Sequence, residues 1–312
     1  MKIIKAILLI SLIVILSILY LNLTHNQAAA VSRETSTINQ MEMQKVLEAT
    51  IQIYMFPQDS LNALGVVPGQ KSLNDAIADA NVEYRYEMGL GTLVNQNGEI
   101  IIITHDHWKD LDALGMIQFR NAAGDALFEL DGDTFKALIR YQDGGTMILG
   151  RDTEGDRSDY LSALIAISQA KYNRRIMPAE LSVNQPIHEG QNLIIVRQGR
   201  SGSKAVELMA VNVEAVGERW GQLVYKLRSA DGGDIMPGDS GGGLWLEGRL
   251  IGNMWKSKYT YGVDWDALEL EQHWTETSYA AGLPDFSDEV PQVLETDQIV
   301  DDVESMASAG EF

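Results

Sequence analysis

From residue 82 onward the chain is a succession of short β-rich runs, and this pattern restricts the fold more than any other feature. Turn sequences such as Ala-Gly-Asp, Asp-Gly-Asp and Asp-Gly-Gly separate runs that are rich in Val, Ile, Leu, Tyr and Phe. The predicted strands are 117–120, 126–130, 135–141, 146–149, 192–196, 206–216, 222–227, 243–246 and 250–255. Two consecutive antiparallel meanders of this kind predict a mainly β protein with two small barrels.

The composition excludes several classes of chemistry. The 312 residues include no cysteine, so disulfides, thiol catalysis and cysteine-rich zinc sites are all ruled out. The formal net charge of -20 at pH 7 argues against a nucleic-acid partner, because binding to phosphates requires a basic surface. Cationic peptides are better partners for such a chain.

The N-terminus carries a segment that is expected to meet a membrane. Lys2 and Lys5 precede an uncharged run over 6–23, which as a helix would reach about 27 Å, close to the thickness of a bilayer core. The run favours an uncleaved anchor over residues 1–30, although the small residues 28–30 leave a removable signal peptide as the alternative. In both cases the rest of the chain is expected outside the cytoplasm.

Two further segments flank the β-rich region. Apolar residues recur at helical spacing between Thr37 and Phe56, and a second short helical pattern covers 72–80, so residues 31–81 are expected to form a helical stalk or linker. After Pro284 the chain has nine acidic residues and neither lysine nor arginine. Residues 281–312 therefore read as a largely disordered acidic tail.

The sequence Pro-Gly-Asp-Ser-Gly-Gly-Gly at 237–243 places a serine where chemistry is possible. Glycines allow a sharp turn and a close approach of substrate to main-chain N–H groups. The amides of Gly238 and Ser240 could then stabilise an oxyanion, with Ser240 as the nucleophile. The alternative for a bare Gly-x-Ser-x-Gly is a glycine-rich hairpin with an ordinary solvated serine, but the five consecutive residues from Gly238 to Gly242 are more specific.

Gly-Asp-Ser-Gly-Gly resembles the nucleophile loop of the chymotrypsin-like (trypsin-fold) serine proteases. Upstream, the run 89–94, an Asn-Gly turn and the strand ending Thr104-His-Asp-His107 resemble the glycine-led hairpin and Thr-x-x-His strand end of that family. The resemblance covers about residues 82–280 and implies two six-stranded antiparallel barrels, with His107 as the base and no catalytic role for His105. Two positions depart from the family: Gly243 replaces the usual proline, and Trp108 stands where many animal members have a disulfide cysteine.

A third triad member is less clearly marked. Asp143 precedes the apolar strand 146–149 and resembles the family's Asp-then-strand element with altered spacing, so it is the first choice for orienting His107. Asp159 also precedes an apolar run and is the alternative. Turn formation would equally explain Asp143, and capping of a helix over 158–172 would equally explain Asp159.

The resemblance implies a membrane-tethered serine endopeptidase that acts on protein or peptide substrates without a cofactor. Six residues before Ser240, Asp234 falls where the family places the floor of its specificity pocket, which would favour arginine or lysine; a solvated turn is the alternative. Family members made as zymogens pair a freed N-terminus with the aspartate before the nucleophile, here Asp239. Because no Ile-Val-Gly-Gly sequence is present, we expect no such activation.

Two other functional classes compete with this interpretation. His105 and His107 resemble the His-x-His motif of metallo-β-lactamase-fold zinc hydrolases, and His188 resembles a later histidine of that fold. However, the expected His-x-His-x-Asp-His pattern is broken after His107, so no metal is predicted. An inactive protease-like binding module is the third possibility.

Overall fold

The computed structural model describes residues 40–66, 73–78, 84–96, 99–108, 111–142, 145–150, 161, 165, 176–181, 186–200, 205–219, 222–230, 232–264 and 269–283. The chain divides into Met1–Gln44, whose described residues 40–44 are helical, and Lys45–Phe312, which holds all the strands. The predicted membrane segment over 1–30 lies outside the described residues, as does the predicted acidic tail from residue 284 onward, while the first two residues of that predicted tail, 281 and 282, belong to a strand. Within the described part of the chain, no helix has the length and apolarity needed to cross a bilayer.

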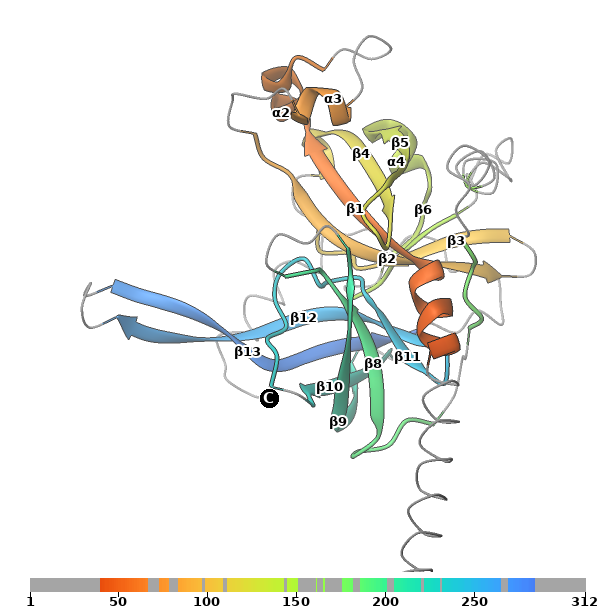
Figure 1. Ribbon diagram of the computed structural model, residues 1–312, viewed down its shortest axis with the longest axis vertical. Coiled ribbons are helices and arrows are strands. Elements are labelled where there is room, and N and C mark those ends of the chain that lie inside the picture. The colour runs from red at the N-terminus through yellow and green to blue at the C-terminus, as the bar shows by residue number, and fades with distance from the viewer. Residues whose placement is uncertain are drawn as a thin grey trace, which may run out of the picture. The chain divides into compact units, whose positions relative to one another are not determined.

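The first sheet has seven antiparallel strands in the order β5-β4-β1-β2-β3-β7-β6 (Figure 1). Their bounds are β1 Thr50–Pro57, β2 Glu87–Gln96, β3 Glu99–Thr104, β4 Leu114–Asn121, β5 Ala126–Asp131, β6 Ile139–Gln142 and β7 Met147–Leu149. Short helices connect them: α2 Gln58–Leu64, α3 Leu73–Ala78, the 3-10 turn η1 Leu111–Ala113 and α4 Gly132–Ala137. The 72–80 helical pattern thus predicted α3 correctly.

Strand β1 corrects the sequence-based prediction of a helix up to Phe56. The helix ends at residue 49, and β1 pairs with both β2 and β4 in the interior of the sheet. Ile51, Ile53 and Met55 alternate along one face and are buried in its core, while Gln52 donates to the carbonyl of Asn121. β-branched residues at a period of two therefore outweigh the helical spacing of the same stretch.

A second correction concerns the strand predicted over 135–141. Residues up to Ala137 belong to α4, because Asp131 caps this helix by accepting hydrogen bonds from the Thr134 N–H and hydroxyl, both at 2.8 Å. These contacts lower the pKa of the Asp131 carboxyl. Strand β6 begins only at Ile139, so an aspartate read as part of a turn is in fact a helix cap.

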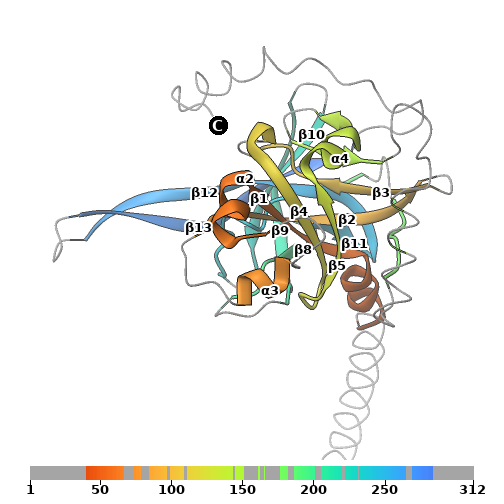
Figure 2. The same ribbon diagram turned by 90° about the horizontal axis from the view of Figure 1, so that it is seen from above.

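The second sheet is a closed six-stranded barrel in the order β10-β13-β12-β11-β8-β9. Its strands are β8 Asn192–Arg197, β9 Glu207–Arg219, β10 Gln222–Ser229, β11 Gly243–Leu246, β12 Arg249–Asp264 and β13 Glu269–Gly282. Strands β12 and β13 run on past the barrel as a long antiparallel hairpin, which projects to one side in both views (Figures 1 and 2).

The mainly β class and one six-stranded barrel agree with the sequence-based prediction. The other predicted six-stranded barrel is wrong: this half of the protein is a seven-stranded sheet, because β1 enters it from the range expected to be a stalk.

A shared core and one buried side chain join the two sheets. The core contains Leu90 and Ile103 from the first sheet and Val196 and Trp245 from the barrel. The amide of Asn253 in β12 donates to the carbonyls of Thr104 at 3.4 Å and Gly145 at 3.2 Å, and its oxygen accepts from the Thr146 hydroxyl at 2.9 Å. The end of β3 is therefore fixed against the barrel strand β12.

Candidate active site

The loop before β11 is shaped by glycines in conformations that other residues rarely adopt. Gly238 and Gly241 have φ angles of 92° and 79°. The Asp239 N–H donates to the Met236 carbonyl and the Gly242 N–H donates to the Asp239 carbonyl, both at 3.1 Å. These bonds turn the chain tightly on each side of residue 240.

The three consecutive glycines lie so close to other groups of the protein that a side chain would overlap them. A Cβ on Gly241 would overlap the carbonyl oxygen of Leu90 in β2, and one on Gly242 would overlap the carbonyl oxygen of Val196 in β8. A Cβ on Gly243 would overlap the Trp245 indole nitrogen. The side chains of Trp245, Leu250 and Thr92 therefore leave no space for a side chain at Gly243, where the family pattern has a proline.

Ser240 and His107 meet at the junction of the two sheets. His107 follows β3 and is exposed, and Ser240 is half-buried in the glycine loop. Its hydroxyl Oγ lies 3.1 Å from Nε2 of His107, although 133 residues separate the two in sequence. The Leu90 N–H donates to the Ser240 carbonyl at 2.8 Å and so fixes the serine backbone against β2. This distance allows a histidine to accept a serine proton.

The two amides expected to bind an oxyanion are available. Within the described part of the chain, the N–H groups of Gly238 and Ser240 donate no hydrogen bond, whereas the Asp239 N–H between them does. Backbone N–H groups are rarely left unpaired in folded proteins, and two on one tight turn are the kind of donors that a developing negative charge requires.

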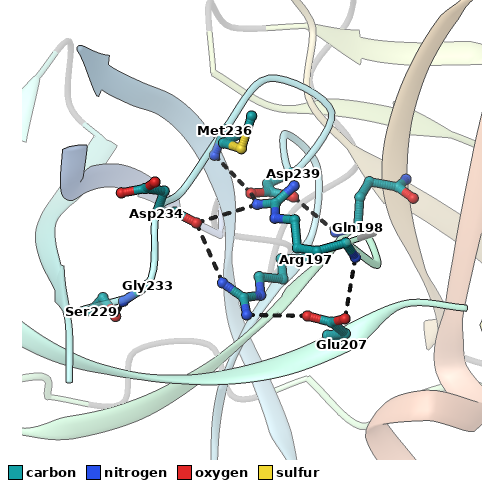
Figure 3. A network of polar contacts seen from close by, with 9 residues as sticks. Arg197, Gln198, Glu207, Ser229, Gly233, Asp234, Met236 and Asp239 are labelled. Atoms are coloured by element: carbon teal, nitrogen blue, oxygen red, sulfur yellow. Dashed lines mark hydrogen bonds and ion pairs between the residues drawn. The ribbon is translucent and has the colours of Figure 1, made fainter. Parts of the chain in front are cut away.

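The side chain of Asp239 fixes the loop around Ser240 to neighbouring segments (Figure 3). Its side chain is fully buried, and its carboxylate accepts hydrogen bonds from the Gln198 N–H at 2.8 Å, the Met236 N–H at 2.8 Å and Nη2 of Arg200 at 2.6 Å. Burial raises the pKa of Asp239, while the Met236 N–H, the Arg200 charge and the Gln198 N–H act in the opposite direction. The carboxylate thus ties the loop to the segment that follows β8.

Arg200 is itself held in place by neighbouring groups. Its Nη2 also donates to the Asp234 carbonyl at 3.3 Å, and its backbone N–H donates to Glu207 at 3.2 Å. Arg197 contacts the same two residues, with an ion pair to Glu207 at 3.1 Å and a hydrogen bond to the Asp234 carbonyl at 3.4 Å. No local motif marks these arginines, because their partners lie in other strands and loops.

The remaining predicted site residues are placed as follows. The side chain of Asp234 is exposed and points away from Arg197 (Figure 3), while its backbone carbonyl accepts hydrogen bonds from both arginines. Its role in a specificity pocket stays a prediction. Asp143 and Asp159 lie outside the described residues. His188 donates its backbone N–H to the Gln191 side chain, and within the described residues no group of three or more His, Asp or Glu side chains could hold a metal ion.

His105, two residues before His107 in sequence, is 3% exposed. Burial first, and the charge of His107 second, hold the pKa of His105 well below its ordinary value of 6.5. Below pH 6.5 the unfolded chain binds a proton at this residue that the folded chain does not. The free energy of unfolding must therefore fall as the pH falls, with a limiting slope of about 1.4 kcal/mol per pH unit.

We expect His105→Phe to remove this part of the acid sensitivity. The free energy of unfolding, measured by urea titration at pH 7 and at about pH 5, should fall less in the variant than in the wild type. An identical decrease in both proteins would show that His105 does not contribute.

Comparisons with known proteins returned solved structures only. No family model and no curated protein matches the sequence. Similar structures include the Rv3671c protease from M. tuberculosis in its active form (13% identity, TM-score 0.39, covering 77% of this chain and 81% of that one). Others are the HtrA-type protease AlgW with a tripeptide (12%, 0.43, 86% and 64%) and Deg5 (17%, 0.41, 71% and 85%). The closed barrel, the glycine loop and the His107–Ser240 pair are consistent with the chymotrypsin-like fold that the sequence resembles.

Proposed function

We propose that this protein is a serine endopeptidase that cleaves peptide bonds through an acyl-enzyme. The observation that carries the proposal is the 3.1 Å separation between Nε2 of His107 and Oγ of Ser240. Support comes from the two amides beside Ser240 that donate no hydrogen bond within the described residues. A nucleophile, a base and an oxyanion site that meet at one place are the groups that acyl transfer requires.

In the proposed mechanism, Ser240 Oγ attacks the scissile carbonyl carbon and its proton passes to His107 Nε2. The resulting oxyanion accepts hydrogen bonds from the N–H groups of Gly238 and Ser240. His107 then gives the proton to the leaving amine, the C–N bond breaks and the acyl-enzyme remains. A water molecule attacks this ester, losing a proton to His107, which returns it to Ser240 as the carboxylic acid leaves.

The third member of the triad is proposed to be Asp143, with Asp159 as the alternative. An aspartate that orients His107 keeps the imidazole in the correct tautomer. Asp143→Asn should therefore reduce turnover by something on the order of 10⁴-fold, while Asp159→Asn should have little effect. Steady-state hydrolysis of a peptide ester by both variants decides between them, and the reverse order of effects would assign the role to Asp159.

The substrate class and location are also part of the proposal. The net charge of -20 favours cationic protein or peptide substrates. The apolar run over 6–23 is proposed to hold the enzyme at a membrane, with the catalytic part outside the cytoplasm. Fractionation of cells that express the full chain should find the protein in the membrane pellet, and a chain lacking residues 1–30 should leave it.

A fluorophosphonate probe tests the reaction class directly, since it bonds covalently only to a serine activated as a nucleophile. We expect one probe per chain, mapped by peptide mass spectrometry to Ser240, and no labelling of Ser240→Ala. Absence of labelling in the folded wild-type protein would reject the peptidase and favour a binding module. Activity that is lost on chelation and restored by zinc would instead favour the zinc hydrolase.

A further inference from the structure

The base His107 has a ring stacked behind it that the mechanism above does not use. The centroid of the His105 ring lies 4.1 Å from that of His107 and 4.0 Å from that of Trp108, with interplanar angles of 34° and 30°. Both pairs are tilted, and at these separations each neighbouring ring is in direct contact with the His105 ring. His105 therefore contacts the ring of the proposed base and the ring of Trp108 at the same time.

The polar atoms of His105 do not explain its position. Among the described residues, neither of its ring nitrogens has a hydrogen-bond partner, and the same holds for the Trp108 indole nitrogen. Leaving buried polar groups unpaired costs stability, so an imidazole kept in such a place needs another reason. His105 does make close ring contacts with its two aromatic neighbours.

Strand β2 leaves room for this stack at one position. A Cβ on Gly89 would lie 2.6 Å from Nε2 of His105 and 2.6 Å from the Cη2 of Trp108, so only glycine fits. The next residue, Leu90, donates its N–H to the Ser240 carbonyl at 2.8 Å. Two neighbouring residues of one strand thus support the base through the stack and the nucleophile through a hydrogen bond.

We propose that His105 is a positioning residue, which fixes the ring plane of His107 by stacking so that Nε2 faces Ser240. This inference rests on the proposed peptidase function and deepens it. A flat, uncharged ring is what the position requires; proton transfer by His105 is not involved. The stack also takes the place of a covalent support, because Trp108 packs against Gly89 in a chain that has no cysteine.

The test compares two replacements of similar size at residue 105. His105→Phe keeps a flat ring and should react with the fluorophosphonate probe within about threefold of the wild-type rate. His105→Leu fills the volume without a flat ring and should react more slowly by something on the order of 10- to 100-fold, because small displacements of a catalytic group are costly. The pH dependence of the labelling rate should keep the same midpoint in the wild type and in His105→Phe.

A second pair of variants perturbs the stack from the opposite side. Gly89→Ala should slow labelling as His105→Leu does. Gly217→Ala in β9 is its matched control, because a Cβ there meets nothing within 4 Å, and it should label like the wild type. Equal rates for the wild type, His105→Leu and Gly89→Ala would overturn the inference, as would slow labelling of a folded His105→Phe.

A measurement that does not depend on catalysis separates this inference from the proposed function. The stacked ring should shift the His107 ring protons upfield in NMR spectra, and the shift should persist in His105→Phe and disappear in His105→Leu. If the wild type shows this pattern of shifts but is not labelled by the probe, the peptidase function is rejected and the ring contact between His105 and His107 stands. If the probe labels the wild type but the His107 shifts are the same in all three proteins, the peptidase function stands and the positioning role of His105 is rejected.

Discussion

Ser240→Ala should reduce the rate of peptide-bond hydrolysis by about 10⁶-fold, and His107→Ala should reduce it by a similar factor, because nucleophile and base act as one unit. The contact between Nε2 and Oγ motivates this expectation. The double variant should then be no slower than either single variant, which is the signature of two residues that serve the same step.

Initial rates on a peptide ester, with circular dichroism to verify folding, provide the measurement. Both side chains are at least partly exposed, so the melting temperature should change little. His188→Ala is the matched control and should keep full activity, since His188 is exposed and its hydrogen bond is made by its backbone, to Gln191. Multiplicative effects of Ser240→Ala and His107→Ala would contradict a shared role.

The second large effect is expected at the buried ion pair beneath the nucleophile loop. Arg200→Met removes the only side-chain cation that contacts the Asp239 carboxylate within the described residues, and leaves the buried charge with two backbone N–H groups. Breaking a buried pair by removing one partner costs about 3 to 5 kcal/mol. Arg200 retains some exposure, so the lower end of that range is the expected loss in the free energy of unfolding.

Arg200→Met should also lower kcat, because Asp239 lies in sequence between the two residues whose amides are proposed to bind the oxyanion. Loss of one such donor typically costs about 10² to 10³ in kcat, and a loop no longer held by Asp239 should lose a comparable amount with little change in KM. Arg197→Met is the control: it contacts Glu207 and the Asp234 carbonyl but not Asp239. Equal effects of the two arginine variants on kcat would show that the Asp239 contact is not what matters.

The ion pair between Arg200 and Asp239 holds the loop around Ser240 without a new N-terminus made by cleavage. The resemblance left the partner of Asp239 open, and the structure supplies Arg200 from the segment after β8. An uncleaved chain thus already carries a cation in contact with Asp239.

The sequence predicted those parts of the fold and site that depend on neighbouring residues. Ser240 and His107, whose side chains the structure brings to 3.1 Å, could be proposed from the sequence because a glycine-rich loop and a Thr-x-x-His strand end mark them locally. Arg200 was missed because its partner lies 39 residues away, in a loop with no shared pattern. Strand β13 was missed for a related reason: residues 269–282 are largely polar, and pairing with β12 rather than an apolar run makes them a strand.

The hydrogen bond between Leu90 and Ser240 has a consequence for the biosynthesis of the protein. The nucleophile belongs to the barrel, yet its backbone is fixed by a strand of the other sheet, and its base comes from that sheet too. A chain in which only one sheet has folded therefore contains no assembled catalytic pair. Under the proposed function, a newly made molecule would therefore gain peptidase activity only after both halves have docked.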